Sequence, residues 1–484
     1  MTLRILFSLV LLSLPSLSFS QEGYPLFTTD FPPEEFARRR SAVYAAIGEG
    51  NVALVQGAPM PVGYVRFRQS NEFYYLCGIE TPHAYLLLNG STKRASVYLP
   101  NRNVARERSE GKVLSAEDDE LVRKLSGVDA VFSTDVLAEH LARMAWTSSV
   151  KTIYTPFQPA ERLATSRDLA VRVIADYASD PFDGRGSREA HFINLLKAKF
   201  PQFEIKDLSP ILDELRLIKS PREISMIRKA TRLSGLALIE GMRSTQPEMY
   251  EYELDAMAKY IYYLNGAQGE AYYSLIASGP NAMFGHYNAG KRKMQKGDFL
   301  LFDFAPDVGY YMADVTRMIP VSGIFNAWQR ELYTFYLGCY RAVLKAIRPG
   351  LTAQAVKQAA VKEMEQVLSR SKFSKPTYEE AAKRFVENYR QGAANPNTTL
   401  GHWVGMATHD VGGYTGPLRP GMVFTIEPAL RVPEENINIR LEDMVLVTEK
   451  GMENMSEFVP MDIEAIEKVM KEEGMVQRYA KEKD

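Results

Sequence analysis

The chain has 484 residues, of which 46% are hydrophobic and 24% are charged, and its formal net charge at pH 7 is −1. This length is sufficient for two or three domains with buried cores, and the near-neutral charge gives no electrostatic basis for binding nucleic acid. The sequence contains two cysteines, Cys77 and Cys339, which we expect to be small buried apolar residues rather than a disulfide.

Residues 1–20 have the pattern of a secretory signal peptide. Arg4 precedes an apolar run at residues 5–14, and the small residues Ser18 and Ser20 follow it. We therefore expect cleavage after Ser20 and a periplasmic or secreted mature protein without a membrane span. The alternative is an uncleaved membrane anchor.

An α/β domain is expected over residues 21–208, because strand-like segments alternate there with amphipathic helical segments. The expected strands are residues 51–57, 95–100 and 152–157, and the expected helices are residues 36–48, 135–146 and 188–200. Residues 73–79, which contain Cys77, are expected to form a further strand. The sequence of this domain shows no cluster of acidic residues or histidines that would indicate a site.

A second domain, with mixed helices and strands, is expected over residues 209–462. Ser220, Pro221 and Glu223 form a capping box with proline in the first turn, which predicts a helix that extends to Met242. Further helices are expected at residues 250–265, 328–347, 352–368 and 379–389. The remaining segment, residues 463–484, alternates Glu and Lys and is expected to be a solvated helical tail.

Two acidic residues interrupt an apolar hairpin in this second domain. Residues 299–304 are expected to form a strand, residues 305–309 a turn and residues 310–321 the returning strand. Asp303 and Asp314 are equidistant from the centre of this turn. We therefore expect their carboxylates to face each other, with Cβ atoms about 5 Å apart.

The same arrangement recurs further along the chain, where Glu427 and Glu442 are equidistant from a turn between Glu434 and Glu435. Four carboxylates that converge on one site would carry about four negative charges, which two divalent ions balance most simply. The alternative is that all four are solvated surface acids, but that alternative leaves their apolar flanking residues unexplained.

Three histidines lie near these hairpins in the sequence. His402 and His409 lie in a glycine-rich segment, and glycines allow a ligand and the backbone to approach closely. His286 precedes the first hairpin. A mixed Asp, Glu and His shell without thiolates suits Mn²⁺, Co²⁺ or Zn²⁺. We therefore expect two divalent ions, with Mn²⁺ as the first choice and Co²⁺ or Zn²⁺ as alternatives.

These motifs resemble the five-ligand signature of the M24B metallopeptidases, the proline-specific family that includes aminopeptidase P and prolidase. The motifs are Asp303, Asp314 in Asp-Val-Thr-Arg, His402 in His-Trp-Val-Gly, Glu427 in Thr-Ile-Glu-Pro, and Glu442 in Ile-Arg-Leu-Glu-Asp. Residues 66–78 and 215–221 also resemble the N-terminal domain and the junction of that family. The resemblance implies an α/β, creatinase-like N-terminal domain followed by an α+β catalytic domain with the pita-bread fold.

The resemblance also implies a role for each matched ligand. Asp303 would chelate one metal ion, Asp314 and Glu442 would bridge two ions, and His402 and Glu427 would hold the second ion. In such a site, a hydroxide that bridges the two metals attacks the peptide carbonyl.

Further residues are assigned to catalysis by the same resemblance. His286 and His409 would contact the substrate carbonyl and stabilise the charge that develops on it. Glu427 would shuttle a proton to the leaving nitrogen of proline. Arg440 precedes Glu442 by two residues and would point into the site, either towards the substrate or as a structural ion pair with a ligand carboxylate.

Two positions and one loop depart from the family pattern. Thr398 replaces a further histidine that shapes the substrate pocket, so we assign Thr398 to substrate binding and expect an effect on turnover or on preference for proline. Ala305 replaces a usual glycine, with little expected effect. Residues 413–421 form a shorter loop than in prolidases, where an arginine grips the dipeptide carboxylate, and Arg419 is the one candidate here.

We therefore expect a secreted Xaa-Pro aminopeptidase that acts on short peptides with proline in the second position, as a homodimer or larger homo-oligomer. One alternative is an Xaa-Pro dipeptidase with the same chemistry. Another is a catalytically silent pita-bread module used for binding. Silent relatives typically lose ligands, whereas all five are present in this sequence.

Overall fold

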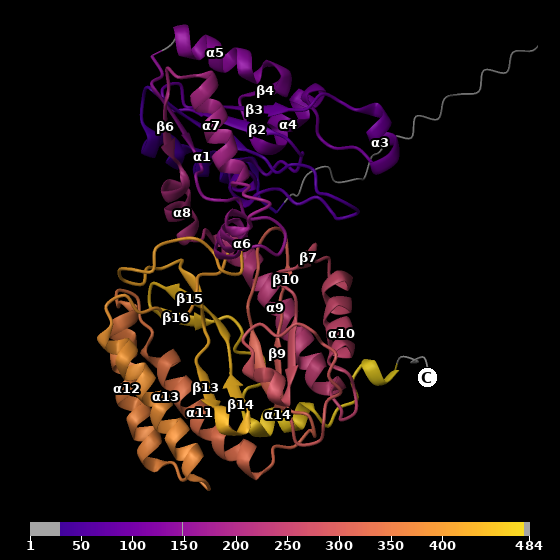
Figure 1. Cartoon of the computed structure of the whole chain (residues 1–484), viewed down its shortest axis with the longest axis vertical. Helices are drawn as coiled ribbons and strands as arrows, with labels where there is room; N and C mark the ends of the chain where they lie inside the picture. The colour runs from indigo at the N-terminus through magenta and orange to yellow at the C-terminus, as the bar shows by residue number, and fades with distance from the viewer. Residues whose placement is uncertain (1–29, 148, 479–484) are drawn as a thin grey trace, which may run out of the picture.

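The computed structural model describes residues 30–147 and 149–478, so the predicted signal peptide lies outside the described residues. The N-terminal and C-terminal halves of the chain stack along the long axis of the molecule (Figure 1). In the described ranges, no helix combines the length and the apolar character that a membrane span requires.

The N-terminal half is built on a six-stranded sheet with the order β4-β3-β2-β1-β5-β6. Its strands are β1 (Asn51–Gln56), β2 (Tyr85–Asn89), β3 (Arg94–Leu99), β4 (Ala130–Ser133), β5 (Thr152–Thr155) and β6 (Glu204–Asp207). Strands β1 to β3 are antiparallel, and β4, β5 and β6 each pair in parallel with a neighbour. The predicted α/β class of this half is confirmed.

Apolar side chains pack against both faces of this sheet, and this half contains seven helices within the described residues. They are α1 (Pro33–Ile47), α2 (Asn71–Cys77), α3 (Val104–Glu110), α4 (Asp119–Ser126), α5 (Leu137–Thr147), α6 (Arg167–Ser179) and α7 (Arg188–Lys199), with the short 3-10 turns η1 (Ala116–Asp118) and η2 (Thr134–Val136). In β1, Ala53 and Val55 join one hydrophobic core, and Val52 and Leu54 join the other. Because successive side chains of a strand point to opposite faces, a strand between two helical layers is apolar throughout.

The prediction of a strand at residues 73–79 is wrong, because α2 occupies this segment. Every residue of α2 is buried, so the helix has no polar stripe, and a short apolar run of this kind cannot be distinguished from a strand by its periodicity. Cys77, at the end of α2, and Cys339 are both buried free thiols, as expected.

The C-terminal half places small antiparallel sheets between two groups of helices. Helices α9 and α10 lie on one side and α11 to α13 on the other (Figure 1). The helices are α8 (Ser209–Leu217), α9 (Pro221–Ser244), α10 (Glu251–Leu264), α11 (Ala327–Ala346), α12 (Ala353–Arg370), α13 (Pro376–Ala394) and α14 (Ile463–Val469), with the 3-10 turns η3 (Gly279–Met283), η4 (Pro433–Glu435) and η5 (Val476–Arg478). The helices predicted in this half are present, with ends that differ by one to several residues.

The sheets of this half have the orders β11-β9-β8, β12-β15-β16, β13-β14 and β10-β7. Their strands are β7 (Gly269–Glu270), β8 (Leu275–Ser278), β9 (Phe299–Asp303), β10 (Pro306–Asp307), β11 (Thr316–Pro320), β12 (Val423–Ile426), β13 (Ala429–Val432), β14 (Ile437–Arg440), β15 (Asp443–Thr448) and β16 (Gly451–Asn454). The mixed helices and antiparallel strands confirm the predicted α+β class.

A local sequence signal accounts for the start of α9. The Ser220 hydroxyl accepts a hydrogen bond from the Glu223 backbone N–H, and the Glu223 carboxylate accepts one from the Ser220 N–H, so the predicted capping box is confirmed.

Helix α14, in the predicted C-terminal tail, buries Ile463 and Ile466 in the core. The tail is therefore not purely solvated as predicted, because two apolar residues one turn apart anchor its first helix.

Candidate metal centre and active site

The second acidic hairpin has the register that the sequence predicts. Strands β13 and β14 pair Ala429 with Arg440, and β12 and β15 pair Ile426 with Asp443. These two ladders share one register, which places Glu427 opposite Glu442 in the short gap between them. The turn at the end of the hairpin is η4.

The first hairpin differs from its prediction by two residues. Asp303 pairs with Thr316, not with Asp314. The loop between β9 and β11 contains a tight bridge between Val308 and Tyr311, and its residues Pro306 and Asp307 pair with β7, so the loop is not a simple turn. The carboxylates of Asp303 and Asp314 nevertheless meet, because one oxygen of each lies 2.5 Å from the Tyr272 hydroxyl.

The imidazole of His402 brings the two hairpins to one point. Its Nε2 atom lies 3.5 Å from Asp314 Oδ2, 3.4 Å from Glu427 Oε1 and 3.7 Å from Glu442 Oε1. The ligand atoms of Asp314, His402 and Glu442 all lie within 4.8 Å of one another. Because the Tyr272 hydroxyl joins Asp303 to Asp314, the structure brings the five predicted ligands together in one cluster.

Glycine accounts for the close approach of His402 to the second hairpin. The backbone N–H of Thr425, in β12, donates to the His402 carbonyl oxygen at 3.0 Å. A Cβ atom on Gly401 would clash with the carbonyl oxygen of Thr425. A side chain at position 401 would therefore push His402 away from β12, as expected for a glycine-rich binding segment.

The cluster is buried and carries more negative than positive charge. Asp303, Asp314 and Glu442 are only 4%, 6% and 1% exposed, so the alternative of solvated surface acids is wrong. Burial raises the pKa of Asp303 although the charge of Arg440 opposes the shift, and burial and the charge of Glu442 raise the pKa of Asp314. Burial together with the charge of Glu442 raises the pKa of Glu427 to about 7. Isolated buried carboxylates are costly and require cations or protons.

The donor atoms of the cluster fit divalent metal ions. Glu442 Oε1 is buried and has no hydrogen-bond partner among the described residues, although the neighbouring Oε2 accepts a hydrogen bond from Thr316 at 2.8 Å. An orphaned carboxylate oxygen beside three further carboxylates and one imidazole is a donor set suited to Mn²⁺, Co²⁺ or Zn²⁺. The residues present therefore fit the predicted cofactors.

Arg440 supplies the guanidinium of this cluster. It forms an ion pair with Asp303, and its Nη1 lies 3.9 Å from Glu427 Oε2. This contact matches the second of the two predicted roles, an ion pair with ligand carboxylates.

Tyr272 is a member of the site that the sequence does not reveal. It lies between β7 and β8, outside any motif, and reaches Asp303 and Asp314 only through the fold. Burial and the adjacent carboxylates raise the pKa of the Tyr272 hydroxyl well above its ordinary value, which keeps it a hydrogen-bond donor.

The other predicted site residues, His409, His286 and Thr398, lie at different places relative to the cluster. The His409 ring lies 4.2 Å from the His402 ring, so His409 borders the cluster. His286 is exposed on the loop after η3 and makes no hydrogen bond or ion pair with the cluster within the described part of the chain. Thr398 is buried and accepts a hydrogen bond from Lys357 Nζ at 2.7 Å. The structure therefore brings His409, but not His286, to the carboxylates.

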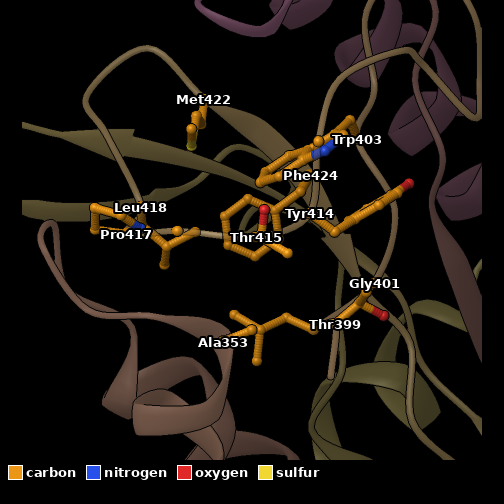
Figure 2. Close-up of a pocket in the computed structure, with 13 residues that line it drawn as sticks. Ala353, Thr399, Gly401, Trp403, Tyr414, Thr415, Pro417, Leu418, Met422 and Phe424 are labelled. Atoms are coloured by element: carbon orange, nitrogen blue, oxygen red, sulfur yellow. The ribbon is translucent and has the colours of Figure 1, made fainter. Parts of the chain in front are cut away.

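An apolar pocket is lined by Gly401 and Trp403, the two chain neighbours of His402 (Figure 2). Trp403 and Tyr414 stack with their ring centroids 5.3 Å apart and, with Phe424, form its aromatic wall. Ala353 and Thr399 lie across from these rings.

Two family models match the chain. Residues 225–449 match metallopeptidase family M24, and residues 36–154 match the N-terminal domain of aminopeptidase P. The first range contains all five predicted metal ligands.

Curated relatives and solved structures cover most of the chain. The Xaa-Pro aminopeptidase of Escherichia coli (strain K12) is 31% identical over 458 residues, covering 90% of this chain and 97% of that protein. An Xaa-Pro dipeptidase of Pyrococcus horikoshii is 30% identical over 269 residues, covering 55% of this chain and 70% of that protein.

The solved structures agree in overall fold. The structure of E. coli aminopeptidase P with the inhibitor Pro-Leu is similar at 25% identity, with a TM-score of 0.73 and coverage of 93% of this chain and 100% of that one. Pseudomonas aeruginosa aminopeptidase PepP gives 26% identity, a TM-score of 0.73 and coverage of 93% and 99%. The chain therefore belongs to metallopeptidase family M24, in its M24B branch, and is a metallo-aminopeptidase with the pita-bread catalytic fold.

Proposed function

We propose that the protein is a secreted Xaa-Pro aminopeptidase that holds two divalent metal ions and removes the residue ahead of a penultimate proline. The observation that carries this proposal is the convergence of two carboxylate hairpins and His402 on one buried point. The E. coli relative, matched over 97% of its length, is an Xaa-Pro aminopeptidase, which supports the substrate class.

Five side chains would hold the two ions. They are Asp303, Asp314, His402, Glu427 and Glu442. When bound, divalent ions would lower the pKa of a coordinated water and polarise the peptide carbonyl. We expect Mn²⁺ as the native metal, with Co²⁺ or Zn²⁺ as alternatives. A structure of the E. coli enzyme has been solved with zinc substituted, which supports a site that accepts more than one divalent metal.

The residues around the ligands suit the remaining steps of peptide hydrolysis. The Glu427 side chain is 29% exposed, so a bound substrate can approach this carboxylate and exchange a proton with it. His409 is part-exposed beside His402 and can donate a hydrogen bond to the developing oxyanion. His286 would join them from its exposed loop once a substrate is bound, since catalytic contacts often tighten only in the complex.

Arg419 favours an aminopeptidase over a dipeptidase. It is the only arginine in residues 413–421, and its guanidinium forms an ion pair with Glu214 at 2.7 Å. A dipeptidase needs a free cation to grip the carboxylate of its short substrate. With Arg419 engaged, we propose that the preferred substrates extend beyond the proline.

A panel of three peptides tests this function. Mature protein should cleave an Xaa-Pro-Xaa tripeptide faster than an Xaa-Pro dipeptide, and should leave an Xaa-Ala-Xaa control largely intact. Chelation should abolish cleavage and added Mn²⁺ should restore it, with Asp314→Asn as the inactive control. A preference for the dipeptide would support the prolidase alternative. Absence of metal-dependent cleavage would support a silent binding module.

The proposal extends to location and assembly. The signal-like residues 1–20 support secretion or a periplasmic location, and N-terminal sequencing of the mature protein would locate the cleavage site. We also propose a homodimer or larger homo-oligomer, which light scattering of the purified protein would test.

A further inference from the structure

Helix α6 of the N-terminal half contacts the border of the metal cluster. It lies between the two ranges that match family models, 36–154 and 225–449. At its first turn, the Asp168 Oδ2 atom lies 2.9 Å from His409 Nδ1. The hydroxyl of Ser166, the N-cap residue of α6, accepts a hydrogen bond from the His409 backbone N–H at 3.2 Å. Both the ring and the backbone of His409 are therefore held by this segment.

Both partners of the Asp168–His409 contact are anchored by their neighbours in sequence. Arg167 forms an ion pair with Glu161 at 3.2 Å, and Glu161 pairs with Arg216 at 2.7 Å. Arg216 in turn pairs at 2.5 Å with Asp410, the residue after His409. A chain of buried or nearly buried ion pairs therefore connects the residue before Asp168 to the residue after His409.

Further partners tighten this network. Arg167 also contacts Glu72 at 2.8 Å and Asp213 at 2.6 Å, and Asp410 also contacts Lys219 at 3.1 Å. Long buried side chains with several fixed partners lose the freedom to adopt other rotamers. This ion-pair network therefore fixes the position of α6 relative to the loop that contains His409. The exposed Asp168–His409 pair is not needed for that placement.

The contact with Asp168 determines how the His409 ring is presented. A carboxylate accepts hydrogen bonds only, so Nδ1 of His409 must carry the proton and donate it to Asp168. This bond fixes the rotation of the ring and leaves Nε2 as the nitrogen available to a reacting group. The hydrogen bond from His409 also lowers the pKa of Asp168, so the carboxylate remains ionised at neutral pH.

We infer that Asp168 is a positioning residue, which orients His409 so that its Nε2 faces the substrate carbonyl. The inference rests on the proposed function, because the catalytic role of His409 is part of that proposal. It adds to the active site a residue from the N-terminal half of the same chain. That residue belongs to a segment that neither family model covers.

A purely structural role for Asp168 is disfavoured by its exposure. The Asp168 side chain is 54% exposed, and no residue of α6 is buried. Exposed ion pairs of this kind contribute little to stability. Loss of Asp168 should therefore change the orientation of His409 without unfolding the protein.

Substitution of Asp168 in the metal-loaded enzyme tests the inference. We expect Asp168→Asn to lower kcat about tenfold, by analogy with the lower end of the range for partners that orient metal-ligating histidines, with KM and metal content unchanged. Asp168→Glu should recover part of this loss. Asp176→Asn, an exposed acid of the same helix, is the matched control and should retain full activity. Full activity of Asp168→Asn would overturn the inference.

A double-mutant cycle separates positioning from any independent effect. In a His409→Ala background, Asp168→Asn should cause no further loss of kcat, since the group it orients is already absent. If the two losses instead multiply, Asp168 acts through something other than His409 and the inference is wrong.

The tautomer of His409 provides a readout that needs no activity. With Zn²⁺ present, ¹⁵N NMR of the imidazoles should show His409 protonated at Nδ1 in the wild-type protein and a changed tautomer population in Asp168→Asn. A wild-type His409 protonated only at Nε2 would overturn the inference. Failure to cleave Xaa-Pro peptides would instead refute the proposed function, and the NMR result would stand apart from it.

Discussion

Thr316 and Glu442 join the two carboxylate hairpins into one unit. Their backbones exchange hydrogen bonds, with the Thr316 N–H donating to the Glu442 carbonyl at 3.2 Å and the Glu442 N–H donating to the Thr316 carbonyl at 3.1 Å. The Thr316 hydroxyl also donates to the Glu442 carboxylate at 2.8 Å. Thr316, in β11, also pairs with Asp303, in β9. One threonine therefore fixes the position of two proposed ligands.

We predict that Thr316→Val weakens metal binding more than it weakens the fold. The substitution keeps the shape of the side chain but removes the hydroxyl that orients Glu442, and loss of such a partner typically costs about 10 to 100-fold in metal affinity. Calorimetric titration with Mn²⁺ measures the affinity. Thr316→Ser should bind as the wild type does.

Thr231→Val is the control for this prediction. Its buried hydroxyl donates to the Ile227 carbonyl within α9, so loss of the hydroxyl should affect stability alone. Equal metal affinity of Thr316→Val and the wild type would show that Glu442 needs no support from Thr316.

Tyr272→Phe should lower activity while leaving the fold intact. The Tyr272 hydroxyl lies 2.5 Å from oxygens of both Asp303 and Asp314, so its removal releases two ligand carboxylates at once. We expect kcat/KM to fall by about tenfold, within the range for residues that orient ligands. Tyr273→Phe, at the exposed neighbouring position, is the control. Unchanged kcat/KM and metal affinity in Tyr272→Phe would show that the hydroxyl is dispensable.

Metal binding should strengthen as pH rises through about 7. Burial and the charge of Glu442 raise the pKa of Glu427 to about 7, so below that pH a metal must displace a proton. Because of this raised pKa, the metal-free fold binds more protons than the unfolded chain between pH 4.5 and 7. The protonated Glu427 therefore stabilises the metal-free fold at low pH, and this contribution is lost as the pH rises to about 7.

The difference in Tm between metal-loaded and chelated protein measures this pH effect directly. It should increase from pH 5 to pH 8, because metal gains affinity over the range in which the metal-free fold loses the contribution from Glu427. Glu427→Gln, which cannot titrate, should flatten the increase. A difference that stays constant, or shrinks, with rising pH would contradict the assignment of Glu427 as a proton-holding ligand.

The buried ion-pair network at the junction of the two halves should be a major element of stability. Arg216 is fully buried and pairs with Glu161 and Asp410, so Arg216→Met leaves two carboxylates buried without their shared cation. Such a loss typically costs about 3–5 kcal/mol of unfolding free energy. Arg143→Met removes the exposed Arg143–Glu139 pair and should cost at most about 1 kcal/mol. Urea denaturation compares the two, and equal losses would refute the prediction.

The sequence predicts the second hairpin better than the first for a physical reason. The two ladders on either side of Glu427 and Glu442 share one register and end in a short turn, so symmetry about that turn gives the correct register. Between Asp303 and Thr316, however, the chain forms β10 and a tight bridge of its own, which shifts the register by two residues. A shift of two keeps the same face of the sheet, so the two carboxylates still meet.

The sequence does not predict contacts between segments that lie far apart in the chain. The hydrogen bond between Asp168 and His409 spans 241 positions, and Asp168 lies in no motif. Tyr272 is likewise placed by the fold alone. His286, in contrast, is assigned only by resemblance, and the structure leaves it exposed. Local signals such as the Ser220 capping box were reliable because their partners lie within four residues.

The count of divalent ions per chain, measured together with cleavage of an Xaa-Pro-Xaa peptide, tests the central claim most directly. Elemental analysis of the active protein should find two ions per chain. Asp314→Asn, which alters a predicted bridging ligand, should bind fewer ions and lose cleavage in parallel. A wild-type protein that binds no divalent ion, or that cleaves the peptide equally well after complete chelation, would contradict the assignment of this buried cluster as a two-metal peptidase site.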